Sequence, residues 1–87
     1  MADYRVYVLQ NEQGQRYIGL SENPRLRLQQ HNAGLSRWTK NKGPWKIVWQ
    51  SGPLSLGEAR KLENRLKRQG RGQGFYSITG LSRSDGS

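Results

Sequence analysis

The chain has 87 residues, no cysteine, and fifteen Lys and Arg against six Asp and Glu, which gives a formal charge of +9. A chain of this length forms one small domain that buries roughly 60–65% of its unfolded surface, which argues against a cofactor-sized cavity. Without cysteine it has neither a disulfide framework nor a thiolate metal site. It shows no apolar signal region and no membrane-length apolar stretch, so we expect a soluble, cytoplasmic protein.

The excess of positive charge predicts a polyanionic partner. Nucleic acid is favoured over a membrane because no strongly amphipathic basic helix with large apolar residues is visible. We expect a single domain over residues 1–81, followed by a flexible tail at residues 82–87.

Residues 4–20 predict a β-hairpin whose loop is Glu12-Gln13-Gly14. A three-residue loop with Gly14 in the left-handed conformation places Tyr7 and Tyr17 on one face as diagonal neighbours, beside the bare backbone of Gly19. A two-residue loop would separate the two tyrosines and split the apolar set. The opposite face is then almost wholly apolar and forms part of the core; it comprises Tyr4, Val6, Val8, Ile18 and Leu20.

Two phenols on the second face indicate a site, although amphipathic tyrosines partly packed under a helix would give the same pattern.

A helix is predicted next, with Asn23 as its cap, Pro24 at its first position, and an end at Gly34. Arg27 and His31 are four residues apart and therefore point the same way. The alternative is a solvated basic helix with an ordinary surface histidine.

Residues 34–44 form a polar basic loop with one aromatic residue. Its cations suit phosphates and its tryptophan suits stacking on a base, although the same tryptophan could plug the edge of the core. The candidate nucleic-acid contacts in this loop are Arg37, Trp38, Lys40 and Lys42. Residues 45–50 alternate in hydrophobicity and predict a third strand.

A capping box at Ser55 and Glu58 opens a second helix that runs through Arg68. Its apolar stripe is Ala59, Leu62 and Leu66. Glu63 lies at the edge of this stripe, where an acid can be half buried. Alternatively, it forms a surface ion pair with Lys67 one turn later. Residues 70–74 are glycine-rich and basic, and residues 75–81 alternate as a strand would.

Taken together, these segments resemble the GIY-YIG nuclease superfamily over residues 4–70. The second signature tripeptide is intact as Tyr17-Ile18-Gly19, and the first is degenerate as Arg5-Val6-Tyr7. Residues 23–32, Asn-Pro-Arg-Leu-Arg-Leu-Gln-Gln-His-Asn, are similar to the family helix that carries an Arg and a His. Residues 58–67 are similar to the later helix with the metal-binding acid. The chain length and the Pro-x-x-Arg-Leu-x-x-His-Asn pattern of residues 24–32 are most similar to the small single-domain bacterial branch.

The resemblance implies an α+β fold with a small three-stranded antiparallel sheet flanked by helices. It also implies a divalent-metal-dependent endonuclease that hydrolyses phosphodiester bonds. Its catalytic positions match Tyr7, Tyr17, Arg27, His31 and Glu63. Tyr7 would be the general base, a role that requires cations and a metal-bound phosphate to lower the pKa of its phenol.

The resemblance further implies that Glu63 binds one Mg²⁺ or Mn²⁺ ion. Arg27 would hold the scissile phosphate, and His31 would assist there or in proton transfer. Tyr17 would orient Tyr7 or a water. Lys67 is a further expected nucleic-acid contact. We expect a monomer that prefers DNA to RNA, with single-stranded or structured DNA as substrate and little base specificity. The rival hypothesis is a non-catalytic nucleic-acid-binding module on the same scaffold.

Overall fold

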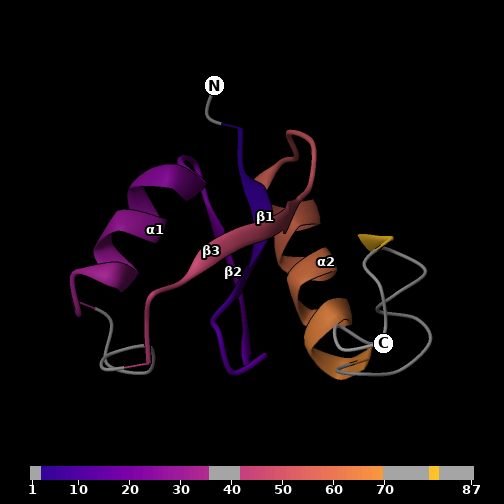
Figure 1. The fold of residues 1–87 in the computed structure, drawn as a ribbon. Helices are drawn as coiled ribbons and strands as arrows, with labels where there is room; N and C mark the ends of the chain where they lie inside the picture. The colour runs from indigo at the N-terminus through magenta and orange to yellow at the C-terminus, as the bar shows by residue number, and fades with distance from the viewer. Residues whose placement is uncertain (1–2, 36–41, 70–78, 81–87) are drawn as a thin grey trace.

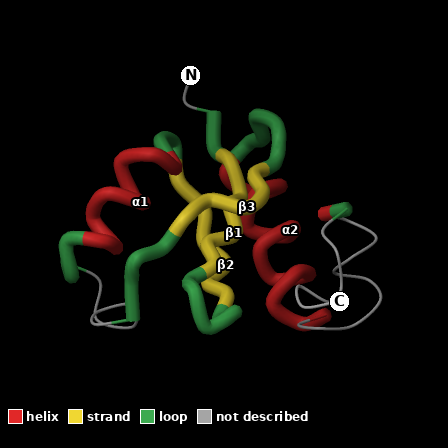
Figure 2. The backbone as a smooth tube through the Cα atoms, in the orientation of Figure 1, coloured by secondary structure: helices red, strands yellow, loops and turns green. Residues whose placement is uncertain are grey.

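The computed structural model describes residues 3–35, 42–69 and 79–80. In these ranges a three-stranded antiparallel sheet, ordered β2-β1-β3, lies between two helices (Figures 1 and 2). The elements in chain order are β1 (Arg5–Gln10), β2 (Arg16–Ser21), α1 (Pro24–Asn32), β3 (Lys46–Gln50) and α2 (Leu56–Gln69). The α+β architecture expected from the sequence is confirmed, with β3 beginning one residue later and α2 ending one residue later than expected.

The hairpin loop has the predicted three-residue form. Gly14 adopts a φ of +83°, and its N–H donates to the carbonyl of Asn11 over 3.1 Å. The resulting register pairs Tyr7 with Gly19, and it puts Tyr7 and Tyr17 on one face with their ring centroids 6.4 Å apart. The loop length therefore sets which side chains meet in the site.

Asn11 anchors this loop from within, because its side chain is only 4% exposed. Its Oδ1 accepts from the backbone N–H groups of Gln13 (3.1 Å) and Gln15 (2.8 Å). Its Nδ2 donates to the carbonyl of Lys42 over 3.0 Å, which ties the hairpin to the segment before β3. A buried amide with these partners satisfied fixes one loop conformation.

α2 covers the apolar face of the sheet. Its predicted stripe faces the hairpin, and Ala59 and Leu66 are fully buried with Val6 and Val8 of β1. Around them pack the partly buried residues Tyr4, Ile18, Leu20, Val48, Trp49, Leu54 and Leu62. This core contains the complete apolar face that the hairpin register predicts.

α1 covers the opposite face, which is a second core. Tyr7, Leu9 and Trp45 are 1%, 0% and 3% exposed, and the partly buried residues packed against them are Tyr17, Leu28 and Ile47. The tyrosines therefore do pack under a helix, as the alternative interpretation has it. Burial on both faces means that a polar atom here must find a partner within the protein.

Capping and a side-chain clamp hold α1 in place. The Asn23 Oδ1 accepts from the N–H of Leu26 over 3.2 Å, and the helix ends before Gly34, which has a φ of +79°. At the far end, Asn32 Nδ2 donates to the Trp45 carbonyl over 3.0 Å, and the Trp45 N–H donates back to Asn32 Oδ1 over 2.6 Å. This reciprocal pair fixes the last turn of α1, and with it the neighbouring histidine, against the start of β3.

The capping box of α2 differs from the expected form in one respect. The Ser55 Oγ accepts from the N–H of Glu58 over 3.2 Å, as expected. The Glu58 carboxylate accepts from the Ser55 hydroxyl over 3.3 Å rather than from its backbone N–H.

Among the residues that the structure describes, no helix has the length and apolar character required to cross a bilayer.

Candidate active site

The centre of the candidate site is a contact between Tyr7 on β1 and His31 on α1. The Tyr7 hydroxyl lies 3.2 Å from His31 Nε2, and each residue is only 1% exposed. The histidine is therefore not the solvated surface residue of the alternative interpretation. It is the polar partner that a buried phenol requires.

Tyr17 on β2 completes an aromatic cluster around this contact. Its ring centroid lies 4.7 Å from that of His31, with an interplanar angle of 58°. Gly19 lies directly against the phenol: an alanine Cβ at this position would be 2.7 Å from the Tyr7 hydroxyl oxygen and 3.1 Å from Tyr17 Cε2. The absence of a side chain at Gly19 is what lets the Tyr7 phenol occupy its place.

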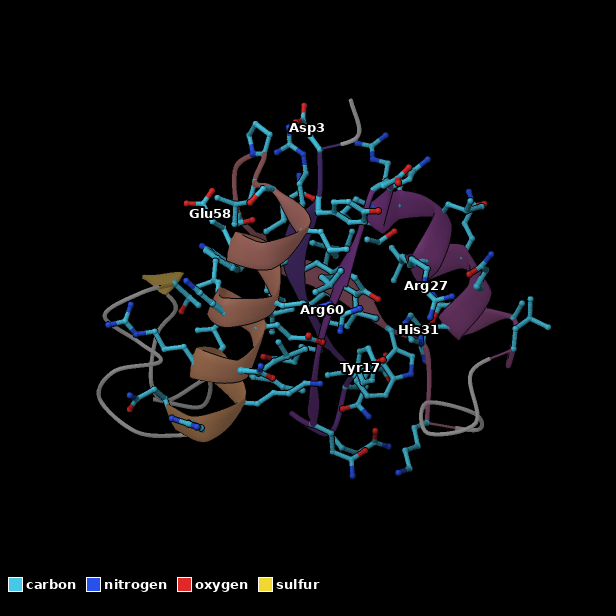
Figure 3. The ribbon with its side chains drawn as sticks, turned by 180° about the vertical axis from the view of Figure 1, so that it is seen from behind. Asp3, Tyr17, Arg27, His31, Glu58 and Arg60 are labelled. Carbon is cyan, nitrogen blue, oxygen red and sulfur yellow. The ribbon has the colours of Figure 1, made fainter. Side chains whose placement is uncertain are left out.

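Arg27 and Glu63 bring opposite charges to Tyr7 from the two helices that flank the sheet. The Arg27 guanidinium lowers the pKa of the phenol, through a hydrogen bond and through its charge, whereas the charge of Glu63 raises it. Arg27 lies one helical turn before His31, and in Figure 3 both side chains lie between α1 and the sheet. Tyr17, His31 and Arg27 therefore surround the Tyr7 phenol, and Glu63 acts on it through its charge.

Burial, the largest influence, raises the pKa of Tyr7 above its ordinary value, and Arg27 opposes this only in part. In the protein alone the cation does not outweigh burial, so the pKa is not lowered in the way that a free phenolate base would need. The phenol keeps its proton at neutral pH. A role for Tyr7 in proton transfer therefore needs an acceptor for that proton.

His31 meets the condition for such an acceptor. Burial lowers the pKa of its imidazole below the ordinary value, and the nearby Arg27 charge lowers it further. At pH 7 the ring is therefore neutral, and a neutral imidazole has one nitrogen that can accept a hydrogen bond. With the proton on Nδ1, Nε2 faces the Tyr7 hydroxyl as an acceptor.

This pKa makes stability depend on pH in a defined direction. His31 is the sole histidine of the sequence. Its pKa is lower in the folded chain than in the unfolded one, where it is about 6.5, so the unfolded state binds the proton first as the pH falls. The free energy of unfolding is expected to fall below about pH 6.5, by at most about 1.4 kcal/mol per pH unit. Urea unfolding between pH 7.5 and 5.5 measures this slope.

The control for that measurement is His31→Gln, in which this contribution to the slope is expected to disappear. An NMR titration of the His31 ring in the wild-type protein gives the folded pKa directly. A folded pKa at or above 6.5 would show that the imidazole is not held neutral.

Glu63 lies on α2 with its side chain 17% exposed, and its Oε2 is 3.1 Å from Lys67 Nζ. Both sequence-based interpretations of Glu63 thus hold, since the carboxylate is mostly buried and is paired with the lysine. Within the described residues no group of three His, Cys, Asp or Glu side chains could hold a metal. A site with this one carboxylate fits Mg²⁺ or Mn²⁺ that keeps most of its waters and takes phosphate oxygens as further ligands. It does not fit a tightly held structural ion.

The expected nucleic-acid contacts are only partly visible. Arg37, Trp38 and Lys40 lie outside the described residues, as do residues 70–78. Lys42 is described, and its backbone carbonyl accepts from Asn11. Lys67 lines a cavity of about 350 Å³ between β2 and α2, together with Arg16, Tyr17 and Ile18.

Three residues that matter for this geometry were not identified from the sequence. Asn32 and Trp45 position α1 through their reciprocal hydrogen bonds. Arg16 lines the cavity beside Tyr17. Its position just before the Tyr17-Ile18-Gly19 tripeptide was available as a signal. The Asn32–Trp45 pair is a contact between residues 13 positions apart, and no sequence signal indicated it.

The sequence profile of the GIY-YIG catalytic domain matches residues 3–75 of the chain. The three strands, the two helices and the cluster around Tyr7 all lie within this match. The chain therefore belongs to the GIY-YIG family, a family of nucleases.

Similar curated proteins place it in the small bacterial branch. It is 40% identical over 67 residues to a UPF0213 protein of Aeromonas salmonicida, which is 76% of this chain and 49% of the relative. It is 32% identical over 79 residues to the UPF0213 protein SH2523 of Staphylococcus haemolyticus, which is 90% of this chain and 96% of the relative. Against a structure-specific endonuclease subunit SLX1 homolog of Drosophila mojavensis it is 38% identical over 55 residues, 52% of this chain and 18% of the relative.

The chain thus spans about half the length of the Aeromonas proteins that it matches. No solved structure matches it.

Proposed function

We propose that this chain is a divalent-metal-dependent endonuclease that hydrolyses phosphodiester bonds in DNA. The observation that carries the proposal is the buried contact between the Tyr7 hydroxyl and His31 Nε2 over 3.2 Å, with Arg27 and Glu63 acting on the same phenol. Hydrolysis needs a group that takes a proton from water, a cation at the phosphate, and stabilisation of the leaving oxygen. The cluster offers one candidate for each task.

Tyr7 and His31 act together in proton transfer. Because the phenol is protonated and the imidazole neutral, Tyr7 gives its proton to His31 Nε2 as its oxygen takes one from the attacking water. The resulting hydroxide attacks phosphorus, one P–O ester bond breaks, and the leaving oxygen is protonated from solvent. Tyr7 has then exchanged one proton for another, and His31 returns the extra proton to solvent after the step.

Arg27 binds the non-bridging oxygens of the scissile phosphate, where its planar guanidinium can donate twice. Tyr17 holds the water or the Tyr7 phenol in line. Because Tyr7 is 1% exposed, the water must reach it past the partly exposed Tyr17 and Arg27, so these two side chains control access. A divalent ion bound at Glu63 would supply charge stabilisation at the leaving oxygen.

Single-stranded or branched DNA is the substrate that fits this recess best. A flexible strand can bend a phosphate toward a buried hydroxyl more easily than a stiff duplex can. The similarity to a structure-specific endonuclease subunit supports the same class. No base-reading element lies among the residues placed at the site, so we infer little sequence preference.

The test is a panel of labelled oligonucleotides, comprising single-stranded DNA, duplex DNA, a flap and single-stranded RNA, each with Mg²⁺, Mn²⁺ or a chelator. Cleavage of single-stranded or flap DNA that the chelator abolishes is the expected result. Binding to these substrates without cleavage of any of them would contradict the proposal and support the non-catalytic module instead.

A further inference from the structure

The cavity between β2 and α2 lies beside the proposed catalytic cluster and takes no part in the proposed proton transfer. Arg16, Tyr17, Ile18 and Lys67 line it, and we call it the β2–α2 cleft. It shares Tyr17 with the cluster, since the ring of that residue lies 4.7 Å from the His31 ring. Two of its four lining side chains are cationic and none is acidic. Its chemistry suits a phosphate.

One of these two cations also contacts the proposed metal ligand. Lys67 Nζ lies 3.1 Å from Glu63 Oε2, and the two residues are spaced i, i+4 on one face of α2. The lysine side chain is 53% exposed whereas the glutamate is 17% exposed, so the lysine is the partner with freedom to leave. The pair therefore has one solvent-exposed member and one mostly buried member.

A divalent ion and this ammonium compete for the same carboxylate. Mg²⁺ binds an oxygen at about 2.0–2.1 Å and brings its own shell of waters, which occupies the space around a carboxylate that accepts it. A nearby ammonium would also repel the ion. An i, i+4 ion pair whose lysine is exposed to solvent is weak, so the exchange costs little.

We propose that the β2–α2 cleft binds the nucleic-acid phosphate next to the scissile one, and that Lys67 transfers from Glu63 to this phosphate when a divalent ion takes its place. Lys67 then couples the two binding events. The metal ion displaces the lysine from Glu63 and makes it available to the nucleic acid. The bound nucleic acid in turn holds the lysine away from Glu63. Arg16 at the other side of the cleft supplies a second donor for the same phosphate.

This inference rests on the proposed function in assigning the metal to Glu63 and in placing the scissile phosphate beside Tyr7, and binding measurements test it without any cleavage. Manganese affinity is measured by electron paramagnetic resonance for the wild-type protein, Glu63→Ala, Lys67→Gln and Lys67→Arg. Lys61→Gln is the matched control, because it removes one positive charge from an exposed position elsewhere on α2.

Without nucleic acid, Lys67→Gln is expected to bind Mn²⁺ about twofold more tightly than Lys61→Gln, which corresponds to loss of one i, i+4 ion pair. Lys67→Arg should stay near wild type. Equal manganese affinities in the two glutamine variants would overturn the exchange. Manganese binding that Glu63→Ala leaves unchanged would overturn it as well, because the ion would then bind elsewhere.

The coupling is tested with a single-stranded phosphorothioate oligonucleotide, with and without Mn²⁺. In the wild-type protein each ligand should strengthen binding of the other by the same factor, as linkage requires. Lys67→Gln should reduce this factor and should lower the salt dependence of oligonucleotide binding by about 0.7 in log–log slope only when Mn²⁺ is present. An unchanged coupling factor would rule out the transfer of Lys67.

The endonuclease proposal and the proposed role of Lys67 can be disproved independently of each other. If the exchange and the coupling occur but no oligonucleotide is cut, the endonuclease proposal fails and the role of Lys67 stands. If DNA is cut in Mg²⁺ but Lys67→Gln matches Lys61→Gln in every binding measurement, the role of Lys67 fails and the endonuclease proposal stands.

Discussion

Replacing Glu63 by alanine is expected to abolish cleavage while nucleic-acid binding survives. The substitution removes a carboxylate whose charge acts on the Tyr7 phenol, and with it the charge stabilisation that a bound ion would give the leaving oxygen. Such stabilisation is worth several kcal/mol, so the rate at saturating enzyme should fall by about 10³-fold or more. Binding should be retained or strengthened, because the chain loses a negative charge and Lys67 loses its partner.

The matched control is Glu12→Ala, which makes the same change in charge at an exposed position of the hairpin loop. It should cut at the wild-type rate. If Glu63→Ala also cuts at the wild-type rate in Mg²⁺, Glu63 is a surface ion-pair residue and the metal site must lie elsewhere.

Replacing Gly19 by alanine is expected to uncouple Tyr7 from His31. The new Cβ would lie 2.7 Å from the Tyr7 hydroxyl oxygen and 2.8 Å from Cζ, closer than real contacts allow. This clash must displace the Tyr7 ring, because the ring is buried and has no open space into which it could turn. The 3.2 Å contact with His31 Nε2 is then expected to be lost. A displacement of about 1 Å at a reacting group can cost about 10²-fold in rate. Overpacking should also cost about 1–3 kcal/mol of stability.

Gly52→Ala is the control, because a Cβ at Gly52 meets nothing within 4 Å and should change neither rate nor stability appreciably. A second variant separates packing from chemistry. Adding Tyr7→Phe to Gly19→Ala removes the atom in the closest contact, so part of the lost stability should return while cleavage stays low. Full activity in Gly19→Ala would show that the position of the Tyr7 hydroxyl is not critical.

The hairpin and both helices were predictable because their signals are local. Gly14 closes a loop whose length fixes the register, and Asn23 and Ser55 cap helices through contacts only three residues away. These contacts depend on backbone preferences that the sequence states directly. The pairing of β3 with β1 is a longer-range contact, and it includes a register shift between Val8 and Leu9 that no local pattern indicated.

The grouping of Tyr7 with Tyr17 and of Arg27 with His31 was predictable, but the environment of these side chains was not. Period-two alternation put Tyr7 and Tyr17 on one face, and the helical spacing put Arg27 and His31 together. The resemblance selected Glu63. Whether that face of the sheet is exposed to solvent or buried depends on α1, whose apolar residues do not gather on one side of the helix. The helix nevertheless buries its histidine, and the raised pKa of Tyr7 follows from that burial.

We propose that Tyr7, His31 and Arg27 act on one phosphate as a unit. Tyr7→Phe removes one hydroxyl and its hydrogen bond to His31, so the free energy of unfolding should change by only about 1 kcal/mol. Cleavage should nevertheless fall by about 10²-fold, the usual scale of a lost general base. Tyr4→Phe is the matched control, because Tyr4 precedes the same strand and packs on the opposite face.

Single-turnover cleavage of a labelled single-stranded DNA in Mg²⁺ by Tyr7→Phe, Arg27→Ala and the double variant is the most direct test. Residues that act in one step have non-additive effects, so the double variant should lose much less than the product of the two single losses. A fully active Tyr7→Phe, or losses that multiply strictly, would show that Tyr7 is a packing residue and that the proton acceptor lies elsewhere.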